Sequence, residues 1–212
     1  MNTRAIVPFM LLLILSGCIS EQAVINKYYT IEETGNEGSD VNEQVAMIGG
    51  FCEVAPVEIN SMYERTQIVN RSASHEITYY KYHQWAIRPS VSIREMVVAQ
   101  MEDTDLFEGV STRYMSRIPD YRLLTKVRKL EVFEDEDEDG FSALLDIEFR
   151  LLDASGTILL DHGTVSKEEL KDKDLNLFAE AVSSIISQEL DQFIEMVGKN
   201  EITEVQSAPG EQ

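Results

Sequence analysis

Residues 79–89 read Tyr-Tyr-Lys-Tyr-His-Gln-Trp-Ala-Ile-Arg-Pro, an aromatic run that ends in a proline. Aromatic residues are enriched in strands, so the segment 77–85 predicts a strand. Pro89 stands where a helix would begin, because proline is favoured in the first helical turn. The stretch therefore predicts a strand that turns directly into a helix.

Two helices are predicted from apolar spacing. In the first, Ser92 and Glu95 have the spacing of a capping box, and Gly109 is a natural stop. The second, over residues 175–197, would be ~35 Å long at about 1.5 Å per residue. The apolar residues on the two helix faces are Ile93, Met96, Val97, Met101 and Phe107 in the first helix, and Leu175, Phe178, Val182, Ile185, Ile186, Leu190, Phe193 and Val197 in the second.

Most of the remaining chain predicts strands. Apolar runs lie at 28–31, 45–59 and 63–70, the second with breaks at Gly49-Gly50 and Pro56. Three further runs, at 123–133, 141–152 and 157–165, are joined closely enough to form an antiparallel meander. This order of elements predicts an α+β fold, with an antiparallel β-sheet and two long helices packed on one face. The other face would be free to meet a partner or a second copy.

The aromatic strand has two sets of side chains. Strict alternation would place Tyr79 and Trp85 on one face, and Tyr80 and Tyr82 on the other. One interpretation is that one set packs against the helices and the other makes cross-strand contacts, since aromatic residues bury large areas. The alternative is that the outward set meets a partner, because exposed aromatic residues often anchor interfaces. The sequence leaves both interpretations open.

The N-terminus has the features of a lipoprotein signal. Arg4 precedes an apolar run that is too short to span a membrane, and Leu15, Ser16, Gly17 and Cys18 follow. These four residues resemble the bacterial lipobox, in which cleavage leaves an acylated cysteine at the new N-terminus. The expected parts of the chain are a signal peptide (1–17), a flexible tether that starts at Cys18 with acyl chains such as palmitate (18–26), a single α+β domain (27–198) and a disordered polar tail (199–212).

Charge and composition exclude some functions. The formal net charge of −20 at pH 7 disfavours binding to nucleic acids and to anionic lipid headgroups. Membrane attachment is therefore expected from the lipid and not from surface charge. The only other cysteine is Cys52, which cannot form an internal disulfide with an acylated Cys18 and lies in an apolar context typical of a buried residue.

One acidic motif suggests calcium binding. Asp135, Asp137, Asp139 and Gly140 match the start of an EF-hand loop, with Asp146 at the twelfth position. An EF-hand needs flanking helices, whereas the flanking runs here predict strands. A solvated hairpin turn is therefore favoured over a metal site.

A second motif, Asp161-His162, suggests a catalytic dyad. No nucleophile motif accompanies it, and His75, His83 and His162 lack metal-ligand spacing. The sequence also has no phosphate-binding or dinucleotide-binding fingerprint. We therefore expect no enzyme activity, no metal and no cofactor.

The stretch 79–89 and the tyrosine-rich opening at 28–31 resemble the ABC-type transport auxiliary lipoprotein family, the PqiC-like group. In that family an aromatic strand ends in a Trp-Ala and proline turn before the first long helix. The resemblance covers about 28–197; a second proline that the family often has is replaced by Arg88, and the acidic insert 134–140 is peculiar to this chain. The positions that match the family pattern, and that a partner could contact, are Tyr28, Tyr29, Tyr79, Tyr80, Tyr82, Trp85 and Pro89.

The resemblance implies a non-enzymatic periplasmic lipoprotein with a fold like the N-terminal domain of TolB. Its partners would be an MCE-type protein and an ABC permease and ATPase complex, which move phospholipid between the inner and outer membranes. The lipoprotein would be the docking end of that assembly, with homo-oligomer formation left open. Ile19 is not the aspartate that retains many lipoproteins in the inner membrane, so we expect the outer membrane, facing the periplasm. Two alternatives are an adaptor in envelope assembly or secretion, and a lipid-anchored hydrolase.

Overall fold

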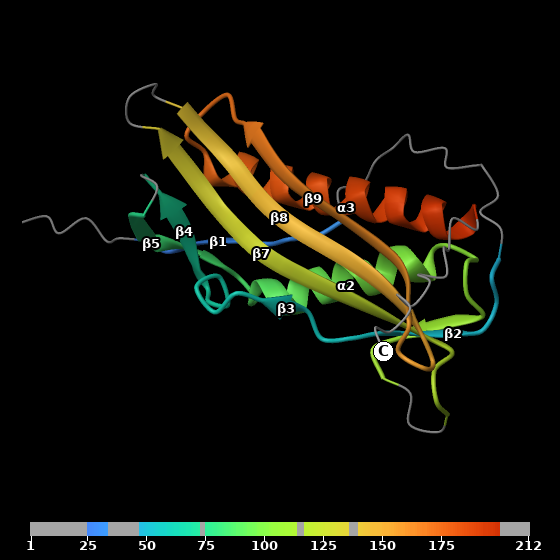
Figure 1. The fold of residues 1–212 in the computed structure, drawn as a ribbon. Helices are drawn as coiled ribbons and strands as arrows, with labels where there is room; N and C mark the ends of the chain where they lie inside the picture. The colour runs from blue at the N-terminus through green and yellow to red at the C-terminus, as the bar shows by residue number, and fades with distance from the viewer. Residues whose placement is uncertain (1–24, 34–46, 73–74, 114–116, 136–139, 200–212) are drawn as a thin grey trace, which may run out of the picture.

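The computed structural model describes residues 25–33, 47–72, 75–113, 117–135 and 140–199. The predicted lipobox at residues 15–18, the tether up to residue 24 and the predicted tail from residue 200 lie outside these ranges. Figure 1 shows a β-sheet with two helices behind it. The expected α+β fold is therefore confirmed.

The central strand of the sheet is β7 (Tyr121–Asp135). On one side it pairs with β8 (Gly140–Asp153), which in turn pairs with β9 (Ile158–Glu169). Both pairings are antiparallel, so the meander expected from the sequence is present. These three strands face the viewer in Figure 1 and form the longest part of the sheet.

The other side of β7 is shared by three shorter strands in succession. They are β2 (Phe51–Val54), β3 (Glu58–Ile59) and β4 (Gln67–Arg71), and all three run parallel to β7. Beyond β4 lies β5 (Ile77–Trp85), antiparallel to it, and then β1 (Lys27–Tyr29), parallel to β5. The single run expected at 45–59 is divided into β2 and β3 because Pro56, between them, has no backbone N–H to donate to a ladder.

The sheet is therefore mixed and not antiparallel throughout. An additional strand, β6 (Gly109–Ser111), pairs with β2 in parallel, although Gly109 was expected only as a helix stop. Parallel strands need long crossover connections, and local apolar runs do not indicate which strands such a crossover joins. This explains why the parallel pairs were missed.

Both helices, α2 (Pro89–Glu102) and α3 (Leu175–Gly198), lie on the same face of the sheet (Figure 1). Pro89 occupies the first helical turn as expected, with Arg88 at the N-cap. The predicted capping box is wrong, because the helix starts before Ser92, which is buried within it. The proline is already compatible with helical backbone angles, so the helix begins there.

The core lies between the helices and the sheet. Phe149 of β8 packs on Phe193 of α3 with ring centroids 5.8 Å apart, and both side chains are fully buried. Gln100 of α2 donates to the backbone oxygen of Ser187 in α3 at 3.0 Å, which joins the two helices. Within the described residues, neither helix has the length and hydropathy needed to cross a membrane.

Cys52 is fully buried in β2, as its apolar context predicted. Burial raises the pKa of its thiol to about 12, and only the thiolate reacts rapidly with disulfide reagents. With Cys18 acylated or replaced by alanine, we expect no reaction of native protein with Ellman's reagent at pH 8, and full reaction of Cys52 in urea. Rapid labelling of the native protein would contradict the burial of this thiol.

Candidate functional site

The five tyrosines predicted as candidate contact residues lie together on β1 and β5. Tyr28, Tyr79 and Tyr82 are exposed, at 61%, 38% and 37% respectively. Tyr29 and Tyr80 are half-buried. The structure thus brings the five side chains into one region but leaves only three of them free to meet a partner.

Trp85 and Pro89, the other two candidate residues, are buried. Trp85 is only 3% exposed, and its ring lies 5.7 Å from that of Phe178 in α3. Its backbone N–H donates to the oxygen of Thr66 at 2.7 Å. These contacts make Trp85 a core residue at the junction of β5 and the helix layer.

The expected placement of Tyr79 on the same face as Trp85 is wrong. The pairing of β4 with β5 contains a register shift: Val69 pairs with Tyr79, whereas Gln67 pairs with Gln84. Between these two pairs β5 has more residues than β4, and the extra residues interrupt the alternation of side chains between Tyr79 and Trp85. Tyr79 is consequently exposed while Trp85 is buried.

The half-buried tyrosines make polar contacts that hold β1, β5 and β7 together. The hydroxyl of Tyr29 lies 2.7 Å from Nδ1 of His83, and their rings are stacked. The hydroxyl of Tyr80 donates to Oε1 of Glu134 at 2.6 Å. Burial, and then this carboxylate, raise the pKa of Tyr80, so its hydroxyl stays a donor. Both side chains therefore position strands.

A groove of ≈ 370 Å³ lies between the β1 segment and α3. Tyr28, Tyr29 and Glu32 line one side, and Asn176 and Glu180 line the other. Its acidic lining disfavours anions. Within the described parts of the chain, no cluster of His, Cys, Asp and Glu has the geometry of a metal site.

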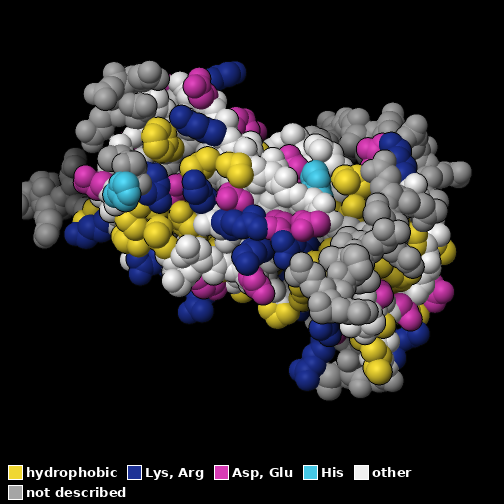
Figure 2. All heavy atoms as spheres, in the orientation of Figure 1, with side chains coloured by type: hydrophobic (Ala, Val, Ile, Leu, Met, Phe, Trp, Pro, Cys, Tyr) yellow, Lys and Arg dark blue, Asp and Glu magenta, His cyan; other side chains and the backbone are white. Residues whose placement is uncertain are grey.

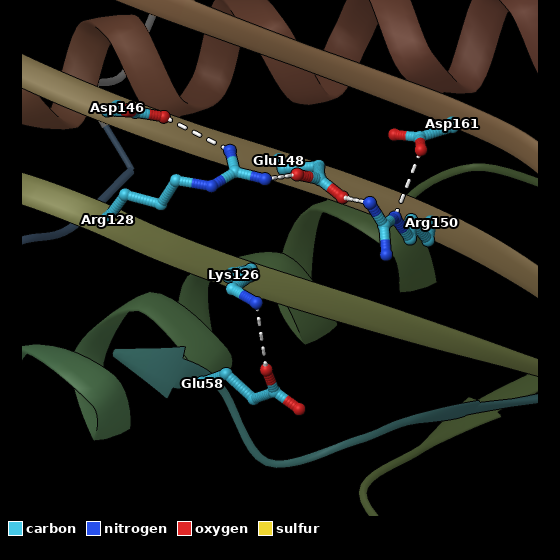
Figure 3. A network of polar contacts seen from close by, with 7 residues as sticks. All are labelled: Glu58, Lys126, Arg128, Asp146, Glu148, Arg150 and Asp161. Carbon is cyan, nitrogen blue, oxygen red and sulfur yellow. Dashed lines mark hydrogen bonds and ion pairs between the residues drawn. The ribbon is translucent and has the colours of Figure 1, made fainter. Parts of the chain in front are cut away.

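The sheet face opposite the helices carries a network of ion pairs. Figure 2 shows basic and acidic side chains mixed across the middle of this face. Figure 3 shows the network from close by, in front of the strands and with α3 behind them. We call it the open-face network; its members are Lys126, Arg128, Arg150, Glu58, Asp146, Glu148 and Asp161.

Glu148 is the centre of the open-face network. Its side chain is only 6% exposed and forms ion pairs with Arg128 and Arg150. Nη1 of Arg128 also lies 3.2 Å from Oδ1 of Asp146, and Nε of Arg150 lies 3.0 Å from Oδ2 of Asp161. The side chains of Arg128 and Arg150 are 44% and 37% exposed, so both arginines remain partly accessible above a buried carboxylate.

A second buried carboxylate, Glu131, lies on the same face of the sheet. It is fully buried, and Arg71 contacts both its oxygens, at 2.6 Å from Nε and 2.9 Å from Nη2. The hydroxyl of Tyr63 donates to Glu131 at 2.7 Å, and burial followed by this carboxylate raises the pKa of Tyr63 to about 12. These three residues tie β4 and β7 to the turn before β4.

Neither the open-face network nor the contacts of Glu131 with Arg71 and Tyr63 were expected from the sequence. Charged residues alternate with apolar ones along β8, as at Asp146, Glu148 and Arg150, and this pattern could have indicated a charged sheet face. No local pattern could have paired Glu131 with Arg71, because they are 60 residues apart in sequence. Only the parallel pairing of β4 with β7 brings them together.

The Asp161-His162 motif does not have the geometry of a catalytic dyad in the structure. Asp161 pairs with Arg150 on the open face, whereas Nε2 of His162 lies 2.8 Å from Oε2 of Glu189 in α3, on the opposite face. They therefore do not form a dyad.

The EF-hand alternative is wrong as well. Strands β7 and β8 flank the loop, and Asp146 is paired with Arg128. Helices would have to take the place of these strands in an EF-hand. The other ligand positions, Asp137 and Asp139, lie outside the described residues.

Comparison with protein families decides the identity of the chain. Residues 29–193 match the family described as the ABC-type transport auxiliary lipoprotein component. The chain belongs to this family. The resemblance inferred from the aromatic stretch is confirmed, and this auxiliary lipoprotein is thereby assigned to the membrane-anchored components of ABC-type transport.

Solved structures show the same fold for this auxiliary lipoprotein. It resembles protein XCC0632 of Xanthomonas campestris, from the DUF330 family, with a TM-score of 0.65 and 16% identity over 82% of this chain and 95% of that one. A crystal structure of an uncharacterised protein matches with a TM-score of 0.63 and 11% identity, over 82% and 99% of the two chains. No curated protein matches the chain. The likeness to TolB stays a prediction.

Proposed function

We propose that this auxiliary lipoprotein is the docking component of an MCE-type phospholipid transport system. Cys18 would anchor it in the outer membrane, facing the periplasm, and the domain would bind the MCE protein and its ABC permease and ATPase complex. The chain would contribute binding and no enzymatic step, with nucleotide hydrolysis left to its partners. Family membership supports the link to ABC-type transport.

The observation that carries the proposal is the sheet face that the two helices leave free within the described residues. Both helices lie behind the sheet (Figure 1), so neither helix of the described residues covers the other side of β7, β8 and β9. Val165 of β9 is 66% exposed there, and it pairs across the strands with Asp146 of the open-face network. An apolar side chain beside partly exposed arginines is a combination that protein interfaces favour. This face is the surface that we assign to the transporter.

Purification of the full-length lipoprotein from its native envelope in mild detergent tests the proposal. Mass spectrometry of the co-purifying proteins is expected to identify an MCE protein with its permease and ATPase. The unanchored Cys18→Ala variant is expected to recover less of them, because it is not held beside the assembly. Recovery of secretion or envelope-assembly components without an MCE protein would contradict the proposal.

A substitution on the open face sharpens this test. Val165→Arg places a bulky cation in the proposed interface, while Asp146 opposite it offers a partner that favours folding. We expect recovery of the MCE protein to fall by about tenfold, which corresponds to ~1.4 kcal/mol of binding free energy.

Ile118→Arg is the matched control. Ile118 is also exposed, at 82%, but lies in the loop before β7 and not on the open-face strands. We expect this variant to recover the MCE protein as the wild type does. Equal recovery with both variants would show that the open face does not bind the transporter.

A further inference from the structure

Exposed apolar side chains are concentrated at one edge of the described structure. Nine large hydrophobic side chains are exposed among the described residues, and six of them lie in or just before β1, on β5, and around the start of α2. All three exposed tyrosines belong to this group. We call it the β1–β5 edge surface; its members are Ile25, Tyr28, Tyr79, Tyr82, Ile87 and Val91.

The strand pairing explains the exposure. β1 pairs only with the last residues of β5, from His83 to Trp85. In the described part of the chain, the segment of β5 before His83 is therefore itself the outermost strand. Tyr79 and Tyr82 lie in that segment, and Tyr28 lies in β1, so the exposed rings follow one continuous edge.

The same edge departs from the acidic character of the chain. The chain has 38 acidic residues among 212, yet residues 25–31 and 77–94 contain none. Lys27, Lys81 and Arg88 are exposed in these segments. The charged side chains within these two segments are therefore all basic, whereas Glu32 and Glu76 lie just outside them in the sequence.

Two cation–aromatic contacts place positive charge beside the exposed rings. Nζ of Lys81 lies 5.0 Å from the ring centroid of Tyr82, and the guanidinium carbon of Arg65 lies 4.2 Å from that of Tyr79. Tyrosine with lysine or arginine is the combination found where proteins meet the headgroup layer of a membrane. There the ring contacts the apolar boundary and the cation contacts phosphate.

The predicted anchor brings this edge to a membrane. The segment from Cys18 to Ile25 can span at most about 25 Å even when fully extended. The chain then enters β1 directly, at Lys27. Because the tether joins the domain at this edge, acylation of Cys18 would keep the edge close to the bilayer.

We propose that the β1–β5 edge surface lies on the phospholipid headgroup layer of the membrane that holds the acyl anchor. Its tyrosines and apolar side chains enter the interfacial region, and Lys27, Lys81 and Arg88 face lipid phosphates. This contact orients the domain on the bilayer in addition to the tether. It rests on the predicted acylation of Cys18 and is separate from transporter binding by the open face.

Photo-crosslinking of the acylated lipoprotein tests the contact. The protein is reconstituted in vesicles of phosphatidylethanolamine and phosphatidylglycerol, with benzoylphenylalanine in place of Tyr28 or Tyr82. We expect phospholipid adducts, detected by intact mass, at both positions. The same label at Val165 or Ile118, both exposed but away from the edge, is expected to give none.

Charge reversal provides a second readout. Lys81→Glu is expected to lower the adduct yield at Tyr82 several-fold, whereas Lys171→Glu, at an exposed residue after β9, leaves it unchanged. Absence of lipid adducts at Tyr28 and Tyr82, equal adducts at Val165, or crosslinks in native envelopes only to another protein would overturn the proposal. The vesicles contain no transporter, so this result is independent of the docking experiment.

Discussion

Replacement of Arg71 by methionine is expected to lower the free energy of unfolding by about 3–5 kcal/mol. Arg71 contacts both carboxylate oxygens of Glu131, which is fully buried. Without the guanidinium group, that carboxylate would stay buried with only the Tyr63 hydroxyl as its partner among the contacts described. Urea denaturation followed by circular dichroism measures the loss.

The matched control removes both charges. Arg71→Met combined with Glu131→Leu is expected to recover most of the stability, because apolar residues can replace a buried ion pair at little cost. Glu131→Gln alone should be intermediate, since it keeps the shape but loses the charge. A loss of less than about 1 kcal/mol for Arg71→Met, the size of an exposed pair, would show that water reaches Glu131.

Replacement of Trp85 by alanine is expected to lower the free energy of unfolding by about 3–5 kcal/mol, as for other buried large aromatic residues. The indole packs on Phe178, so the change leaves a cavity between β5 and α3. The backbone bond from Trp85 to Thr66 remains, since it does not involve the side chain. Urea denaturation measures this loss as well.

Tyr82→Ala is the control for Trp85→Ala on the same strand. Tyr82 is 37% exposed and lies within β5, so its removal should cost about 1 kcal/mol, the span of strand propensities. Similar losses for the two variants would contradict the assignment of Trp85 to the core and of Tyr82 to the edge surface.

Local patterns predicted several elements closely. The aromatic run was expected at 77–85 and is β5 over the same residues. The second helix was expected at 175–197 and is α3, Leu175–Gly198. In β5 and α3, a run of characteristic composition or spacing lies between residues that favour a start and a stop. Each element can therefore be recognised from its local sequence alone. The start of α2 was less accurate because Pro89 and Ser92 offered competing N-terminal signals.

The candidate surfaces were predicted only in part. The tyrosines were singled out as candidate contacts through the family resemblance, but which residues of β5 are exposed depends on the register shift between β4 and β5. Val165 and the open-face network were not singled out, because their significance lies in which face the helices leave uncovered. That face is a property of packing and not of any single strand.

The sequence by itself determined the fold class, most element positions, the predicted anchor and the family, since each depends on local composition or spacing. The tertiary structure decided the parallel pairs, the burial of Trp85 and the pairing of Arg71 with Glu131. It also showed that the acid-free segments 25–31 and 77–94 share one edge of the sheet. The physical reason is range: periodicity and capping act over a few residues, whereas strand pairing and burial join residues far apart in the chain.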